Sequence, residues 1–138
     1  MILEILGVPL QKQSARFAKR GNFMMKYQPK EVTNWAAQAK LQIINQLPKE
    51  HKPLTGEISI CSLRFIFPPL KSWNKKTKET FKTGFKVYKA TRPDVDNLMK
   101  SIFDVCNGLV WVDDAQIVEI EHIEKIYGEV PRIQLEVN

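Results

Sequence analysis

The sequence contains few of the residues from which zinc, disulfide and redox sites are built. Only two of its 138 residues are cysteines, and only two are histidines. Cys61 and Cys106 stand apart among mainly apolar neighbours, without the short spacing of a metal or redox motif, so we expect buried, reduced thiols. His51 and His122 have no second ligand beside them, and we assign neither to a functional site.

Long apolar runs are also absent. No run approaches the roughly 20 residues needed to span a bilayer, and the opening stretch, MILEILGVPL, carries an acid where a signal peptide would be basic. We therefore expect a cytoplasmic protein without a membrane partner. Apolar residues make up 43% of the chain and charged residues 26%, near globular averages, and the length suits one core, so a single domain over residues 1–138 is predicted.

Negative charge is in deficit, because 21 lysines and arginines oppose 15 acids, for a formal charge of +6. Such a surplus favours a polyanionic partner, and nucleic acid is the first to consider. Two segments concentrate the cations and interleave them with aromatic residues. Each segment could contact phosphates or could be a solvated loop. The candidates for phosphate contacts are Lys12, Arg16, Lys19 and Arg20 in the first segment, and Lys71, Lys75, Lys76, Lys78, Lys82, Lys86, Lys89 and Arg92 in the second.

Hydrophobic periodicity predicts an α+β fold. Apolar residues at steps of three and four predict two main helices, at 29–47 and 94–107. A long basic loop at about 68–92 precedes the second helix, and 72–82 within it could form a short surface helix. This order predicts a mixed β-sheet with the two main helices packed on it, and a hairpin formed by the last two strands. The predicted strands are 2–8, 57–67, 109–112, 116–127 and 132–137.

Against the positive background, four aspartates occur in two pairs. Asp94 and Asp96 open the second predicted helix, and Asp113 and Asp114 occupy the turn after 109–112. Each pair has an ordinary structural explanation, as a helix cap or as turn residues that accept local backbone hydrogen bonds. If 109–112 returns antiparallel to the helix, however, the turn reaches the helix's N-terminal end, and three or four carboxylates converge.

Converging carboxylates must protonate, find cationic partners or hold a metal ion. Hard oxygen ligands without cysteine or paired histidine suit Mg²⁺ or Mn²⁺ rather than zinc. Such an ion polarises a phosphodiester and positions a water for attack. Lys100, one helical turn after Asp96, could stabilise the phosphoryl charge, although a salt bridge to Asp96 or Asp104 explains it equally well.

Two stretches, RPDVDNLMKSIFDVCNG and VWVDDAQIVEI, carry D-x-D-N-x-x-K and D-D-x-Q patterns, and GVPLQKQSARF and KSWNKKTKE are weaker matches. In these motifs the chain resembles the RusA family of Holliday-junction resolvases. The resemblance implies an α/β homodimer with two active sites. It also implies that Asp94, Asp96 and Asp114 bind the catalytic metal, with Asp113 a further candidate ligand, and that Lys100 assists the chemistry.

The function implied by this resemblance is Mg²⁺-dependent hydrolysis of phosphodiesters at four-way DNA junctions, by paired cuts in recombination and repair. A homodimer fits the approximate twofold symmetry of such a junction. Three alternatives remain open: a nuclease for flaps or other branched DNA, a non-catalytic junction-binding protein with the same fold, and a protein-interaction domain whose basic loop only provides solubility.

Overall fold

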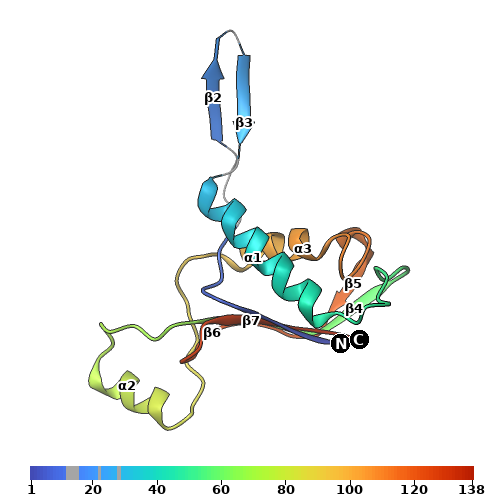
Figure 1. Cartoon of the computed structure of the whole chain (residues 1–138). Helices are drawn as coiled ribbons and strands as arrows, with labels where there is room; N and C mark the ends of the chain where they lie inside the picture. The colour runs from blue at the N-terminus through green and yellow to red at the C-terminus, as the bar shows by residue number, and fades with distance from the viewer. Residues whose placement is uncertain (12–15, 22, 28) are drawn as a thin grey trace.

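The computed structural model describes residues 1–11, 16–21, 23–27 and 29–138, and for 16–20 and 23–27 it describes the backbone alone. A mixed sheet lies at the centre, with two helices packed on one of its faces (Figure 1). The predicted α+β class is therefore confirmed. No helix among the described residues has the length and hydropathy of a membrane span.

A five-stranded sheet runs through the described part of the chain. β7 is antiparallel to both of its neighbours, whereas β5 and β6 pair with β4 in parallel, one after the other along its outer side. The strand predicted at 116–127 is divided at Glu121 and His122, where its alternation falters. The strands are, in spatial order, β1 (Ile2–Leu6), β7 (Arg132–Val137), β4 (Ile58–Phe67), and then β5 (Ile117–Ile120) and β6 (Ile123–Tyr127).

The predicted hairpin between the last two strands is wrong, because β4 lies between β6 and β7. The connection passes across the end of β4, where Gly128 N donates to Phe67 O at 2.8 Å. Only glycine permits this close passage, since a Cβ at Gly128 would lie 2.6 Å from Ile66 Cγ2. Alternation identifies a strand, but it does not identify which strand lies beside it.

Residues 109–112 do not form the predicted strand. They make a tight turn, in which Gly108 N donates to Trp111 O and the Trp111 indole donates to Asn107 Oδ1, both at 2.7 Å. Val110 and Trp111 are completely buried. The short apolar run fills the core at the end of a helix, and hydrophobicity alone cannot separate that role from a buried strand.

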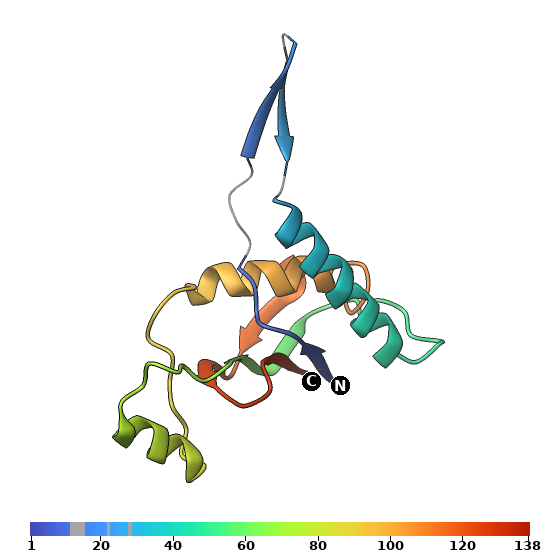
Figure 2. The ribbon, with the colours of Figure 1, turned by 60° about the vertical axis from the view of Figure 1, so that its left-hand side comes forward.

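Both predicted main helices are confirmed. α1 (Lys30–Gln46) and α3 (Val95–Cys106) cover one face of the sheet and contact each other (Figures 1 and 2). Ile43 of α1 and Leu98 and Ile102 of α3 are inaccessible to solvent. Burial of each such side chain stabilises the fold by about 1.5–3 kcal/mol, so the position of α3 on the sheet is strongly determined.

The basic segment at 68–92 contains the expected surface helix, α2 (Lys75–Lys82), whose N-terminus is capped by Asn74 Oδ1 accepting from Thr77 N at 2.8 Å. This segment extends away from the sheet (Figure 1). It then returns along β6, where Tyr127 N donates to Val87 O and Lys89 N donates to Lys125 O, each at 3.0 Å. Residues 87–89 thereby cover the outer edge of β6.

The first basic segment forms a hairpin that the sequence did not predict. β2 (Arg16–Arg20) pairs antiparallel with β3 (Phe23–Tyr27), and Gly21 in the turn has a φ of +60°. Figures 1 and 2 show the hairpin standing beyond the N-terminal end of α1. Of the cations predicted to contact DNA here, Lys12 and the side chains of Arg16, Lys19 and Arg20 lie outside the described residues.

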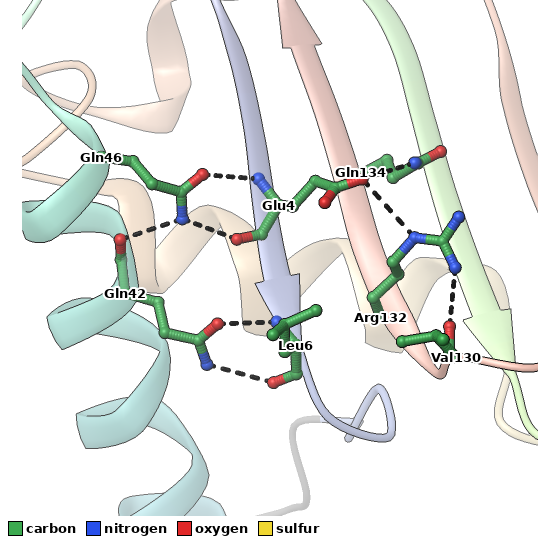
Figure 3. A network of polar contacts seen from close by, with 7 residues as sticks. All are labelled: Glu4, Leu6, Gln42, Gln46, Val130, Arg132 and Gln134. Atoms are coloured by element: carbon green, nitrogen blue, oxygen red, sulfur yellow. Dashed lines mark hydrogen bonds and ion pairs between the residues drawn. The ribbon is translucent and has the colours of Figure 1, made fainter.

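Two glutamines of α1 complete the exposed edge of β1 (Figure 3). Gln46 Oε1 accepts from Glu4 N at 2.9 Å and its Nε2 donates to Glu4 O at 2.6 Å. Gln42 makes the same pair of bonds with Leu6, at 2.7 and 3.1 Å. One helical turn and two strand residues span nearly the same distance, so the two amides replace a missing neighbouring strand. The edge is thus closed to pairing with another chain.

We expect the double variant Gln42→Ala, Gln46→Ala to lower the free energy of unfolding by about 2 kcal/mol, because four backbone groups lose their partners. Urea unfolding measures the loss, and sedimentation velocity detects any association through the freed edge. Gln38→Ala is the matched control, since Gln38 is exposed on the same helix and has no hydrogen bond to β1 in the described residues. Equal stability of the two variants would contradict the role assigned to the amides.

Candidate active site

The N-terminal end of α3 carries charged side chains that have no hydrogen-bond or ion-pair partner in the described residues. Asp94 occupies the capping position, but its carboxylate accepts no capping hydrogen bond, and Asp96 lies in the first turn. Both are exposed, as is Lys100 one turn further on. Within the described residues none of the three side chains makes an ion pair or hydrogen bond, so Asp94 is not a cap and Lys100 is not held by Asp96. All three are available to a ligand.

The backbone before Asp94 is held by a lysine of the sheet. Lys125 of β6 donates from Nζ to Thr91 O and to Pro93 O, both at 2.7 Å. Leu98, one turn into α3, is completely buried. These contacts fix the start of α3 from both sides. No local pattern indicates the Lys125 contacts, because a single lysine in an alternating strand is usually a solvent-facing residue.

The second aspartate pair begins the short 3₁₀ helix η1 (Asp114–Gln116). Asp113 Oδ1 accepts from Ala115 N at 3.1 Å, while Gln116 Oε1 accepts from Asp113 N at 2.8 Å. Gln116 Nε2 also donates to Leu54 O and Gly56 O, at 3.0 and 2.9 Å. Asp113 therefore has the ordinary structural role expected of a turn aspartate, because its carboxylate caps this short helix.

Asp114 lies beside the C-terminal end of α3. Its half-buried side chain shares hydrogen bonds with Asp113 and with Asn107, the residue that ends α3. Partial burial raises the pKa of Asp114 above its ordinary value of 3.8, and the hydrogen bond and charge of Asp113 and the charge of Asp104 raise it further, against the opposing hydrogen bond from Asn107. Negative charge is thus crowded here without a cation to balance it in the contacts of Asp114.

The two aspartate pairs lie at opposite ends of α3. This helix has 12 residues, and at 1.5 Å for each residue it is about 18 Å long. A divalent ion binds carboxylate oxygens within about 2.6 Å, so one ion cannot join the two ends. Consistently, the described residues contain no cluster of three side chains suited to a metal ion. The convergence expected within one chain does not occur, because 109–112 turns tightly instead of running back along the helix.

The basic candidates at 68–92 divide into two groups. Lys86 and Lys89 have partners within the chain: Lys86 Nζ lies 2.9 Å from Glu124 Oε2, and Lys89 Nζ lies over the rings of Phe67 and Tyr127, 5.1 and 5.4 Å from their centroids. The remaining cations are exposed and face solvent. They are Lys71, Lys75, Lys76, Lys78, Lys82 and Arg92.

Glu124 anchors the returning segment to the sheet. Arg64 Nε, Lys86 Nζ and His122 Nε2 lie 3.0, 2.9 and 3.1 Å from its carboxylate, of which only 4% is exposed. Burial alone would raise the pKa of Glu124, but the hydrogen bonds and charges of Lys86 and His122 outweigh it, and the pKa is lowered. His122 thus has a structural contact, and it lies outside the two aspartate pairs.

Comparison with known proteins identifies related chains. The sequence model described as "Endodeoxyribonuclease RusA" matches residues 7–138, a range that includes both aspartate pairs and the basic segment. The crossover junction endodeoxyribonuclease rusA of Lactococcus phage r1t is 28% identical over 137 residues, which cover 97% of this chain and 92% of the phage protein. The uncharacterized protein YqaN of Bacillus subtilis (strain 168) is 33% identical over 98 residues, 68% of each chain.

We expect Asp114→Asn to raise the melting temperature at pH 7 in the absence of divalent ions. A raised pKa means that the folded protein binds the proton of Asp114 more tightly than the unfolded chain does. The contribution of Asp114 to the free energy of unfolding is therefore fully present below pH 3.8, and it is lost as the pH rises through the higher pKa of the folded state. The gain from Asp114→Asn should accordingly vanish near pH 3.

Thermal unfolding of the wild type and of Asp114→Asn in EDTA, at several pH values, measures this effect. Asp96→Asn is the matched control, because Asp96 is exposed and has no charged neighbour in contact within the described residues. A lower melting temperature for Asp114→Asn than for Asp96→Asn at pH 7 would contradict the claim that ionised Asp114 destabilises the folded protein.

Proposed function

Because the chain belongs to the RusA endodeoxyribonuclease family, we propose that it is a metal-dependent endodeoxyribonuclease that resolves four-way DNA junctions. The observation that carries this proposal is the pair of exposed, unpartnered carboxylates, Asp94 and Asp96, directly after a strongly basic segment. A protein that only bound DNA would lose affinity by placing bare acids beside its phosphate contacts.

The aspartates suit Mg²⁺, or Mn²⁺, in both chemistry and charge. Asp94 and Asp96 offer oxygen ligands that no internal partner occupies, and Asp114 has a pKa raised by partial burial and, further, by the neighbouring acids. A cation would relieve that repulsion. When bound, the metal would lower the charge of a phosphodiester and activate a water. Lys100, exposed on the same side of α3 as Asp96 by its four-residue spacing, would stabilise phosphoryl charge.

A homodimer provides a way to bring the two separated acidic groups together. If a twofold axis sets two α3 helices antiparallel, the N-terminal end of one helix lies beside the C-terminal end of the other. Asp94 and Asp96 would then share an ion with Asp114 of the partner subunit. The same symmetry creates a second, equivalent site. Val95 and Val112 are exposed by 38% and 57% next to the two acidic groups and offer apolar area to such an interface.

Two equivalent sites, each formed by residues of both subunits, suit a four-way junction. Two equivalent strands of the junction would each meet one site, and one cut in each would separate the arms. The exposed cations of 68–92 would hold the DNA backbone, so that recognition depends mainly on phosphate placement and junction shape. Lys86 and Lys89 would instead maintain the shape of this segment through their internal contacts.

Asp94→Asn and Asp114→Asn should each reduce junction cleavage in Mg²⁺ by about a thousandfold, because metal stabilisation of transition-state charge is worth several kcal/mol. Binding to the junction should persist, since only negative charge is removed. Cleavage of labelled four-way junction, flap and linear duplex by the wild type tests specificity alongside. Unchanged cleavage in either variant would reject the assignment, and preferential cutting of flap or duplex would reject the junction as substrate.

Mixing the two inactive variants tests whether the sites are shared. In a mixed dimer, one composite site carries both substitutions, whereas the other retains Asp94 from one subunit and Asp114 from its partner. Random exchange should therefore restore about a quarter of the wild-type sites, detected as nicks in one strand of the junction. If each site belonged to one chain, every site would carry a substitution and the mixture would stay inactive.

A further inference from the structure

A pocket of about 280 Å³ opens where the segment 68–92 leaves β4. Its apolar lining includes Leu70, Trp73 and Phe81, and Leu70 remains 43% exposed. The Trp73 ring lies 5.3 Å from Phe81 and 4.8 Å from Tyr127, centroid to centroid, and meets Tyr127 edge-on. Tyr127 is itself buried in the core. The aromatic wall is therefore supported by the sheet and held in place before any ligand arrives.

The rim of the same pocket is positively charged. Lys71, Lys78 and Lys82 contribute to it, against a single acid, Glu129. All three lysines are exposed and have no ion-pair partner in the described residues. An aromatic wall beneath a cationic rim suits a ligand that combines a flat apolar ring with negative charge on either side. A nucleotide within a DNA strand has this combination, because its base can stack while the flanking phosphates meet the lysines.

The charge around the pocket favours a polyanion over an acidic peptide. Between residues 71 and 92 there are eight lysines and arginines and one acid, Glu79. A field of this size and extent matches a continuous backbone of phosphates better than a few carboxylates. The segment also leads directly to the N-terminal end of α3, since Lys125 holds Thr91 and Pro93 just before Asp94.

We infer that this pocket takes an unstacked base from the bound DNA, with the rim lysines on the neighbouring phosphates. The inference rests on the proposed function, and it adds a base-binding site outside the carboxylate centres. Bases at a branch point are easier to unstack than bases within a duplex, so the pocket contributes to the preference for branched DNA. It requires no particular base, because every base has a face that can stack on an aromatic ring.

The test compares two single-stranded probes of equal length and charge: an oligothymidylate and the same oligomer with every base removed. Fluorescence anisotropy measures their affinity for the full-length Asp94→Asn protein, which we expect to leave DNA uncut. We expect the oligothymidylate to bind about tenfold more tightly. Leu70→Gln should remove most of this difference. Val130→Gln, a substitution at an exposed residue outside the pocket, should preserve it.

Two further double variants distinguish the effect of the rim lysines from the general effect of positive charge on DNA affinity. Lys78→Ala with Lys82→Ala removes two charges at the pocket, and Lys75→Ala with Lys76→Ala removes two from the same helix away from it. Both pairs should weaken binding of both probes, but only the rim pair should reduce the preference for the oligothymidylate. Alanine is a good helix former, so α2 is retained in both, as circular dichroism would verify.

Equal affinity of the two probes would overturn the inference, as would a preference that survives Leu70→Gln. Neither result would bear on the nuclease, because the readout is binding without cleavage. Conversely, a wild-type protein that prefers the oligothymidylate but never cuts a junction would reject the proposed function and retain the pocket.

Discussion

The burial of one face of α3 against the sheet is the constraint on which the rest of the structure depends. Leu98 and Ile102 are completely inaccessible, and Val105 is nearly so. Burial of each of these side chains stabilises the packed helix by about 1.5 kcal/mol or more, so the helix has a single position on the sheet. Its two ends are therefore fixed relative to each other, and so are the acidic groups that flank it. A site that uses both acidic groups at once therefore needs one group from each of two copies of the chain.

The distribution of charge follows from this arrangement. Asp94 and Asp96 project from the start of α3 without partners, and Asp114 lies near other acids at the far end. Partial burial and the neighbouring acids raise the pKa of Asp114, so its ionised form disfavours the folded state unless a cation is bound there. The protein thus keeps locally unfavourable electrostatics on a well-packed core, an arrangement that is common where a metal ion or a phosphate is to be bound. The cations that would draw DNA toward these groups lie on a segment that contributes little to the core.

The basic segment at 68–92 has more contacts with the sheet than its composition suggested. Lys86 and Lys89 appeared equivalent to the other lysines in the sequence, but contacts with Glu124 and with the rings of Phe67 and Tyr127 turn both toward the protein. Their partners come from strands far along the chain, so no local pattern could have distinguished them. The same holds for Lys125, whose two hydrogen bonds place the backbone before Asp94.

The amino-acid sequence by itself determined the elements with strong periodicity. Both main helices and most strands were predictable, because burial on one face imposes a local repeat of apolar residues. The sequence also identified the aspartate pairs by type and spacing. Tertiary structure alone decided which strands are neighbours, that 109–112 is a tight turn, and that the two aspartate pairs lie at opposite ends of one helix. These features depend on contacts between residues distant in the chain, and local repeats carry no information about such contacts.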